Sequence, residues 1–142
     1  METEIVAENE DIPKDLASVG SRLLSFIIDN FILIILMLLV FRIISADAET
    51  IDRISSLLGG LINFAYFLYF FSNGQTPGMM AMKIKLIGTD GTYPIGYSKG
   101  FLRYWGLQIS GLVLCLGFLW ILIDKKRQGW HDKIAGTYVV KA

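Results

Sequence analysis

One acidic side chain lies inside the first long apolar segment of the chain. Asp29 belongs to the run Leu23 to Phe41, which consists mostly of Leu, Ile, Phe and Val, and Arg22 directly precedes this run. On insertion scales each large apolar residue contributes roughly −0.3 to −0.6 kcal/mol and a central Asp costs about +2.5 to +3.5 kcal/mol, so the run still favours insertion. Asp29 is the first candidate for chemistry, because acids inside membrane helices by default mark ion or proton pathways.

A structural role for Asp29 is the alternative, and the sequence leaves both open. In a helix Arg22, Ser25 and Asp29 share one face, and Asp29 lies about 10 Å deeper than Arg22. Ser25 or a water molecule can bridge that gap. On the second helix, one face offers Asp29 hydrogen-bond partners at depth, and it carries Ser56, Asn63, Tyr66 and Asn73. Such polar contacts between membrane helices contribute only ~0.6 to 2 kcal/mol. Arg22 itself is expected to anchor the helix end at the lipid phosphates.

Enzymatic chemistry has little support in this sequence. His131 is the only histidine, which excludes a metal site built from several histidines, and the chain has no glycine-rich phosphate loop and no CxxC or HExxH motif. We therefore expect neither catalytic activity nor a cofactor. Asp132 is expected to pair with Lys133 or to cap a helix, and Asp124 to be an interfacial charge.

The composition places the chain among integral membrane proteins. Of its 142 residues, 54% are hydrophobic and only 18% are charged, whereas soluble domains carry about 25% charged residues. The 13 basic and 13 acidic side chains cancel, so no net field favours nucleic acid as a partner. The lipid bilayer is the expected environment.

Two of the apolar segments have the length of membrane-spanning helices. Leu23 to Phe41 and Ile54 to Phe71 each approach the ~20 residues that cross a hydrocarbon core of ~30 Å. Because the connection between them is short, they should form an antiparallel pair. Residues 1–17 are predicted to be a flexible acidic tail, and residues 18–142 to form one membrane domain.

The third apolar block, Tyr104 to Ile123, allows two topologies. A single crossing distributes the Lys and Arg residues evenly, six on one side of the membrane and seven on the other. A bent or re-entrant hairpin places eleven on one side and leaves only Arg42 and Arg53 on the other, a clear positive-inside bias with both termini in the cytoplasm. The length of the block favours the crossing, and the charge distribution favours the hairpin.

A small β-hairpin is predicted between the second and third blocks. Met82, Ile84 and Leu86 alternate with lysines, which is the period-two pattern of a strand, and Asp90-Gly91 is a preferred hairpin turn. The C-terminal segment 137–140 could add another strand. We expect this β-structure on the cytoplasmic face of an otherwise all-α integral membrane protein.

Three motifs occur in an order that resembles the RDD family of membrane proteins, which is named for one Arg and two Asp residues. They are Arg22 followed by Asp29 in the first span, the loop GQTPG at 74–78, and the closing stretch 124–137 with its sequence GWHD. The resemblance extends from Val19 to Val140 and implies that Asp132, or otherwise Asp124, is the second Asp of the family pattern. It also implies a bacterial plasma membrane location and a role in transport.

Two functional hypotheses follow. In the first, the protein is a subunit of a transporter or an ion- or proton-coupled carrier that binds a proton or a monovalent cation. Because two or three spans are too few to enclose a pathway, this carrier would be a homo-oligomer or would assemble with another membrane protein. In the second, the protein is a non-transporting scaffold or accessory protein whose basic face binds anionic lipid or a partner. The candidate pathway residues are Arg22, Ser25, Asp29, Asn63, Asp124 and Asp132.

Overall fold

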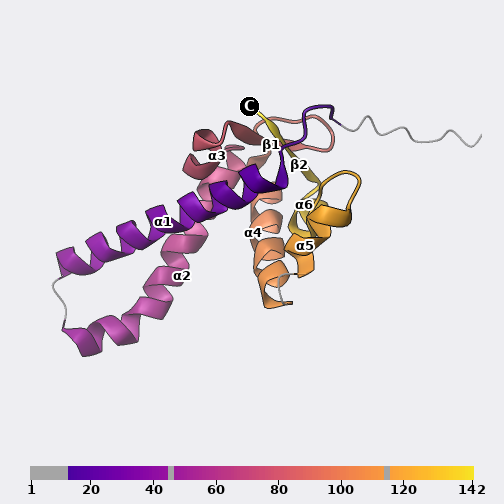
Figure 1. Cartoon of the computed structure of the whole chain (residues 1–142). Helices are drawn as coiled ribbons and strands as arrows, with labels where there is room; N and C mark the ends of the chain where they lie inside the picture. The colour runs from indigo at the N-terminus through magenta and orange to yellow at the C-terminus, as the bar shows by residue number, and fades with distance from the viewer. Residues whose placement is uncertain (1–12, 45–46, 114–115) are drawn as a thin grey trace, which may run out of the picture.

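The computed structural model describes residues 13–44, 47–113 and 116–142. In this part of the chain two long helices extend to one side, and the shorter elements gather where the first long helix begins and the second ends (Figure 1). The elements are α1 (Val19–Ile44), α2 (Ala48–Ser72), α3 (Pro77–Ala81), β1 (Ile84–Gly88), α4 (Gly96–Leu112), α5 (Leu116–Ile123), α6 (Trp130–Ala135) and β2 (Thr137–Lys141).

The helices α1 and α2 contain the two predicted spans and extend them at both ends. Each is long and apolar enough to cross a membrane, and large apolar side chains such as Phe31 and Leu57 stay exposed on their outer faces. At the start of α2 the Asp47 side chain accepts a hydrogen bond from the Thr50 amide, which caps the first turn. The prediction of two membrane helices joined by a short connection is confirmed.

The small sheet joins segments that are far apart in the sequence. β1 pairs antiparallel with β2, and Leu86 lies opposite Val139. The antiparallel sheet is as predicted, but the partner of β1 is the C-terminal strand and not the segment that follows the predicted turn. Burial explains this pairing: Leu86 and Val139 are 0% and 1% exposed, whereas residues 91–94 after the turn are exposed and supply no apolar face.

The segment before α1 also belongs to the folded unit. Leu16 forms an isolated bridge to Val140, and Ala17 is buried and donates its amide hydrogen to the Val139 carbonyl at 2.9 Å. The last part of the predicted tail is therefore packed against β2. Residues 1–12, which carry most of the predicted acidic tail, lie outside the described residues.

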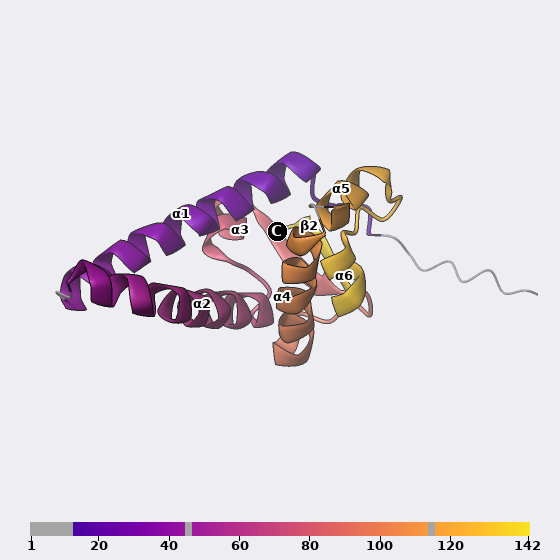
Figure 2. The ribbon, with the colours of Figure 1, turned by 90° about the horizontal axis from the view of Figure 1, so that it is seen from below.

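The third apolar block forms a bent pair of helices instead of one straight span. The axes of α4 and α5 differ by 100°, and in both views α4 runs across the direction of α1 and α2 (Figure 1, Figure 2). The chain then returns along α4, since a Cβ atom on Gly106 would lie 2.8 Å from the Cα of His131 in α6. Because β2 contacts the segment before α1, both ends of the described chain lie on one face, which three full crossings do not allow.

An apolar core attaches the short elements to the end of α2. Phe67 and Phe71 of α2, Met79 of α3, Leu86 of β1 and Tyr104 of α4 belong to one cluster of buried side chains. A packed core of this kind leaves little freedom for relative movement of its elements. It therefore determines which polar side chains of these elements can meet.

This topology predicts the side of the membrane from which introduced cysteines react. In a Cys115→Ser background, Lys14→Cys and Lys141→Cys should both react with an impermeant maleimide from one side, because the two ends of the chain pair through β2. Glu49→Cys, in the first turn of α2, should react only from the other side. The reaction of each cysteine is measured in vesicles that expose one side of the membrane and in vesicles that expose the other side. Reaction of the two terminal positions from opposite sides would rule out the bent third block.

Candidate functional site

A buried carboxylate binds two arginines where α1, α4 and α6 meet. Asp132 is 0% exposed; its Oδ2 accepts a hydrogen bond from Arg22 Nη1 at 3.1 Å, and its Oδ1 forms an ion pair with Nη1 of Arg103. Arg22 also donates to the Val139 carbonyl at 3.3 Å, and Arg103 donates to Thr137 Oγ1 at 3.0 Å. This cluster joins three helices and β2 through charge-assisted hydrogen bonds.

The first turn of α6 sets the position of Asp132. Gly129 is the N-cap residue, and its amide donates to Asp132 Oδ2 at 2.9 Å. The side chain of Gln128 donates to the Thr137 carbonyl at 2.9 Å and so connects the start of α6 to β2. After the helix, Gly136 has a φ of 63°, a left-handed conformation that glycine adopts without strain. The chain therefore turns directly into β2, and Asp132 faces both arginines.

Two positive charges share one carboxylate in this cluster. Burial opposes the ionisation of Asp132, but Arg103 and Arg22 outweigh it and hold the pKa of Asp132 well below its usual value. Burial also lowers the pKa of His131 to about 4, so its imidazole is neutral at pH 7. The His131 Nε2 lies 3.7 Å from Asp132 Oδ2. The three charged side chains therefore carry a net positive charge in the interior.

Asp29 is held by neutral donors. It is 2% exposed; its Oδ1 accepts hydrogen bonds from the Tyr66 hydroxyl and from the Gly78 amide, each at 2.8 Å, and its Oδ2 accepts one from Thr76 Oγ1 at 2.5 Å. Within the described residues no Lys, Arg or His side chain forms an ion pair with this carboxylate. The three contacts attach α2 and α3 to α1.

The loop at 74–78 brings its donors to Asp29 by starting α3. Thr76 is the N-cap residue, and its Oγ1 accepts a hydrogen bond from the amide of the third helical residue while it donates to Asp29. Pro77 takes the first helical position, where the absent amide hydrogen has no partner to lose. A Cβ atom on Gly78 would overlap the Ser25 carbonyl oxygen and lie 2.8 Å from Asp29 Cγ. Only glycine allows this approach of α3 to α1.

Three expectations for the polar face of α1 are wrong. Arg22 does not reach toward lipid phosphates, because its guanidinium is in the ion pair with Asp132. Ser25 Oγ donates to the Arg22 carbonyl at 2.8 Å and so does not bridge Arg22 and Asp29. Asn63 is not a partner of Asp29 but lines a separate groove between α1 and α2. The reason is that the loop before α3 lies against α1 and supplies donors to Asp29 from closer range.

The two candidates for the second acid have different surroundings. Asp124 pairs with Lys133 at 2.7 Å and accepts a hydrogen bond from the Gln128 amide at 3.0 Å. Asp132 lies in the interior, where it contacts Arg22 and caps the first turn of α6 as predicted. The predicted pairing of Asp132 with Lys133 does not occur, because Lys133 is on the outer side of α6.

Sequence reasoning missed Arg103 and Thr76 as members of the site. Arg103 lies among Phe, Leu, Tyr and Trp in the sequence FLRYW. A charge in such apolar surroundings needs a buried partner, because burying an unpaired charge is costly. The pair Thr76-Pro77 is typical of a helix start, and it predicts that the Thr76 hydroxyl lies at the N-cap position of a helix. Tyr66 is predicted from the polar face that it shares with Asn63, and its hydrogen bond to Asp29 confirms that prediction.

Comparison with known proteins gives one match that covers most of the chain. The model of the RDD family matches residues 16–136. The chain belongs to the RDD family. The match includes the helices α1 to α6 and therefore both buried acids, Asp29 and Asp132. Of the two candidates for the second Asp of the RDD pattern, Asp132 is the one in contact with Arg22.

A second comparison finds a shorter similarity between this RDD chain and a larger protein. A proline-rich antigen of Mycobacterium leprae (strain TN) is 35% identical over 66 residues, which is 46% of this chain and 26% of that protein. No solved structure matches the chain. In the described part of this RDD protein, no three His, Cys, Asp or Glu side chains come together as a metal site.

The close contact at Gly78 gives a test of the Asp29 cluster. Gly78→Ala should lower the free energy of unfolding by about 1–3 kcal/mol, because the added methyl group forces α3 away from α1. Gly111→Ala is the matched control, since a Cβ atom there has open space around it. Denaturant unfolding in detergent micelles, followed by circular dichroism, compares the two. Equal stability of both variants would show that the contact does not hold α3 in place.

The neutral state of His131 predicts sensitivity to acid. Its pKa is about 4 in the folded protein and 6.5 without the fold, so the unfolded chain binds more protons between these values. The contribution of neutral His131 to the free energy of unfolding is fully present above pH 6.5. It is lost as the pH falls from 6.5 toward 4, and the free energy of unfolding decreases by about 3 kcal/mol in total.

The measurement for His131 is the free energy of unfolding at several pH values. In His131→Gln, which does not titrate, the loss of stability between pH 6.5 and pH 4 should be much smaller than in the wild type. Asp132 does not interfere, because its lowered pKa keeps it ionised throughout this range. The same pH dependence in both proteins would show that His131 is not held neutral by the fold.

Proposed function

We propose that this RDD protein is a subunit of an ion- or proton-coupled carrier that acts as an oligomer, and that Asp29 alternately holds a proton or a monovalent cation. The observation that carries this proposal is the difference in charge balance between the two buried acids. Asp132 has two arginine partners, whereas Asp29 is in a membrane-spanning helix with neutral donors only. A buried carboxylate without a cation is costly, so a proton or a mobile cation is the natural compensation.

The donors around Asp29 suit both states of the carboxyl group. The hydroxyl groups of Thr76 and Tyr66 can rotate and act as donor or acceptor. If Asp29 Oδ2 carries a proton, it can donate to Thr76 Oγ1, while Oδ1 keeps the fixed hydrogen bond from Gly78. If the carboxylate is ionised, the same oxygens accept hydrogen bonds from both hydroxyls. Release and uptake of a proton therefore need only rotation of hydroxyl hydrogens.

The distribution of charge supports an orientation in the cell membrane. Eleven of the 13 Lys and Arg residues lie on the side of the spans that carries the sheet and both ends of the described chain, and only Arg42 and Arg53 lie near the α1–α2 connection. By the positive-inside rule the sheet is then cytoplasmic. We infer a multi-pass protein of the bacterial plasma membrane.

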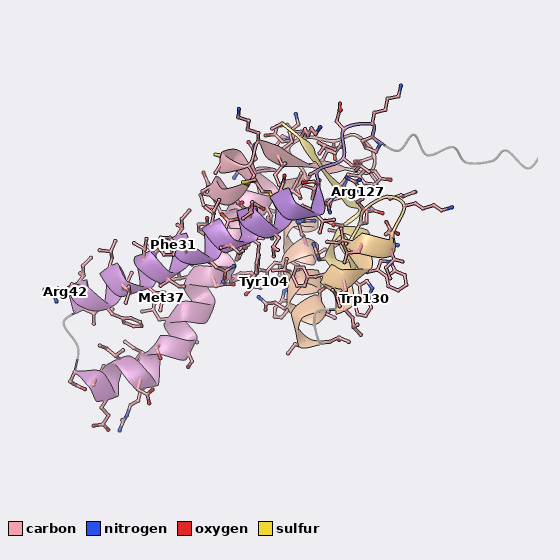
Figure 3. All side chains as sticks on the ribbon, viewed as in Figure 1. Phe31, Met37, Arg42, Tyr104, Arg127 and Trp130 are labelled. Carbon is pink, nitrogen blue, oxygen red and sulfur yellow. The ribbon has the colours of Figure 1, made fainter. Side chains whose placement is uncertain are left out.

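A scaffold or accessory role is the second candidate, and a different observation favours it. Both acids also hold elements together, and Lys125, Arg127 and Lys141 are exposed on the face that bears the sheet. Arg127 is labelled at this end of the molecule in Figure 3. Such a basic surface attracts anionic lipid headgroups or an acidic partner protein, whether or not Asp29 exchanges ions.

The two roles differ in what happens when Asp29 loses its ionisable group. Asp29→Asn can keep its carbonyl oxygen on Tyr66 and Gly78 and donate from its amide to Thr76, so the fold should persist. For a carrier, proton-coupled flux of Na⁺, K⁺ or Li⁺ into liposomes should fall to the level of protein-free liposomes. Asp90→Asn removes the same charge from an exposed loop and should retain wild-type flux.

The outcomes separate the two roles. Flux that is equal in Asp29→Asn and the wild type would remove Asp29 from any pathway. If liposomes that contain the wild-type protein show no flux of Na⁺, K⁺ or Li⁺, the scaffold role is favoured. Binding of the protein to anionic vesicles would then be the property to measure. Asp29→Leu, which loses all three hydrogen bonds, should reduce stability in either case.

A further inference from the structure

A groove between α1 and α2 contains two amide side chains at the depth of the membrane interior. It has a volume of about 250 Å³, and Asn30 and Asn63 lie among its otherwise apolar lining. With a rise of 1.5 Å per residue, Asn30 lies about 10 Å inside the span end at Leu23, and Asn63 lies about 12 Å inside the span end at Phe71. The two amides are therefore at similar depth within a hydrocarbon core of ~30 Å.

Within the described residues these amides are incompletely hydrogen-bonded. Asn30 donates one hydrogen to the Phe26 carbonyl of its own helix at 2.7 Å, and Asn63 takes part in no hydrogen bond with the described residues. Asn63 is half-buried, and its amide has two donor hydrogens and an acceptor oxygen. Hydrocarbon offers no partner to such a group, and an unpaired amide in apolar surroundings costs free energy.

The backbone of α2 beside Asn63 is open to close approach. A Cβ atom on Gly60 would have no atom within 4 Å, and Gly59 is covered from the α1 side by Met37, whose Cε would lie 3.3 Å from an added Cβ. Figure 3 shows Met37 on the side of α1 that faces α2. Small residues at such positions let two membrane helices pack closely. Gly60 therefore gives another helix access to the amide of Asn63.

We propose that this groove is the interface of a homodimer in which Asn63 forms a reciprocal hydrogen bond with the Asn63 of the partner subunit. Two copies with the same membrane orientation can be related by a two-fold axis along the membrane normal. Such an axis places every residue at the same depth as its counterpart. Because an amide is both donor and acceptor, identical Asn63 side chains are complementary to each other. The interface deepens the oligomeric part of the proposed function, but its geometry does not depend on Asp29.

A second copy of the chain fits the groove better than a lipid chain or another protein, because it also supplies a hydrogen-bond partner for Asn63. A lipid chain can fill the apolar part of the groove, but it leaves Asn63 without a partner. A helix of another protein would need a polar side chain at the same depth, whereas a second copy has one there by symmetry. The groove therefore favours self-association.

The first test is the dissociation constant of the dimer in liposomes. Labelled wild-type protein is diluted with lipid, and energy transfer between donor and acceptor copies reports the dimer fraction. Asn63→Ala should raise the dissociation constant by about three- to thirty-fold, the equivalent of a membrane hydrogen bond of ~0.6 to 2 kcal/mol. Asn73→Ala is the matched control, because Asn73 is exposed and its amide donates to the Tyr69 carbonyl of its own helix; it should leave association unchanged.

Disulfide crosslinking locates the interface independently of that substitution. In a Cys115→Ser background, Gly60→Cys should form a crosslinked dimer under mild oxidation. Phe31→Cys, on the exposed outer face of α1, should remain uncrosslinked. A monomer at all dilutions, an unchanged dissociation constant in Asn63→Ala, or crosslinking at Phe31→Cys instead of Gly60→Cys would overturn the proposed interface. Unchanged flux in Asp29→Asn from a protein that stays dimeric would overturn the role of Asp29 in the carrier and leave the interface intact, so the two proposals fail separately.

Discussion

The contact of Asp132 with Arg22 and Arg103 is the interaction on which the rest of the structure depends. It joins side chains that are 110 and 29 positions apart in the sequence. Because it attaches α6 to both α1 and α4, the chain must turn back after α5, and β2 can then reach β1. A buried ion pair of this kind adds little net stability compared with apolar side chains, but loss of one partner leaves an unpaired charge that costs about 3–5 kcal/mol. Its main effect is to define which segments meet.

The two buried acids Asp29 and Asp132 each attach a short element to α1, with different electrostatics. Asp132 attaches α6 to α1 through fixed positive charges, and Asp29 attaches α3 to α1 through hydroxyl and amide donors. Both tie a short element to the end of the first span that lies beside the sheet. Within the described residues only Asp132 of these two acids has a cationic partner. A change in the charge of Asp29 would therefore act directly on its hydrogen-bond partners in α2 and α3. Mechanical coupling and ion binding at Asp29 are therefore compatible.

The bilayer explains why so many apolar side chains of the long helices have no protein partner. Hydrocarbon solvates the exposed faces of α1 and α2 as well as another helix would, so these faces need no cover. An amide has no such partner in lipid. This difference separates the groove that contains Asn63 from the apolar surfaces around it. The helices α4 and α5 meet the same constraint, since Gly106 of α4 lies against His131 of α6 and Gly117 of α5 lies against the N-cap residue Gly129.

The sequence by itself determined the class of protein, the two spans and the identity of three key residues. Apolar runs of about twenty residues leave a membrane helix as the stable state, and a charge inside or beside such a run is conspicuous because its transfer is costly. Arg22, Asp29 and Asp132 could be selected in this way or through the RDD motifs. The charge count also indicated that both termini lie on one side.

Only the tertiary structure decided the partners of these residues. Asn63 and Tyr66 are on the same helix, yet Asp29 bonds to Tyr66, because the loop before α3 occupies the space around the carboxylate and leaves Asn63 in the groove. Arg22 pairs with a residue near the other end of the chain, and β1 pairs with β2 instead of a neighbouring strand. Period and composition describe which face of a segment is polar or apolar. They do not describe which faces of distant segments meet, because that depends on the packing of all elements in one core.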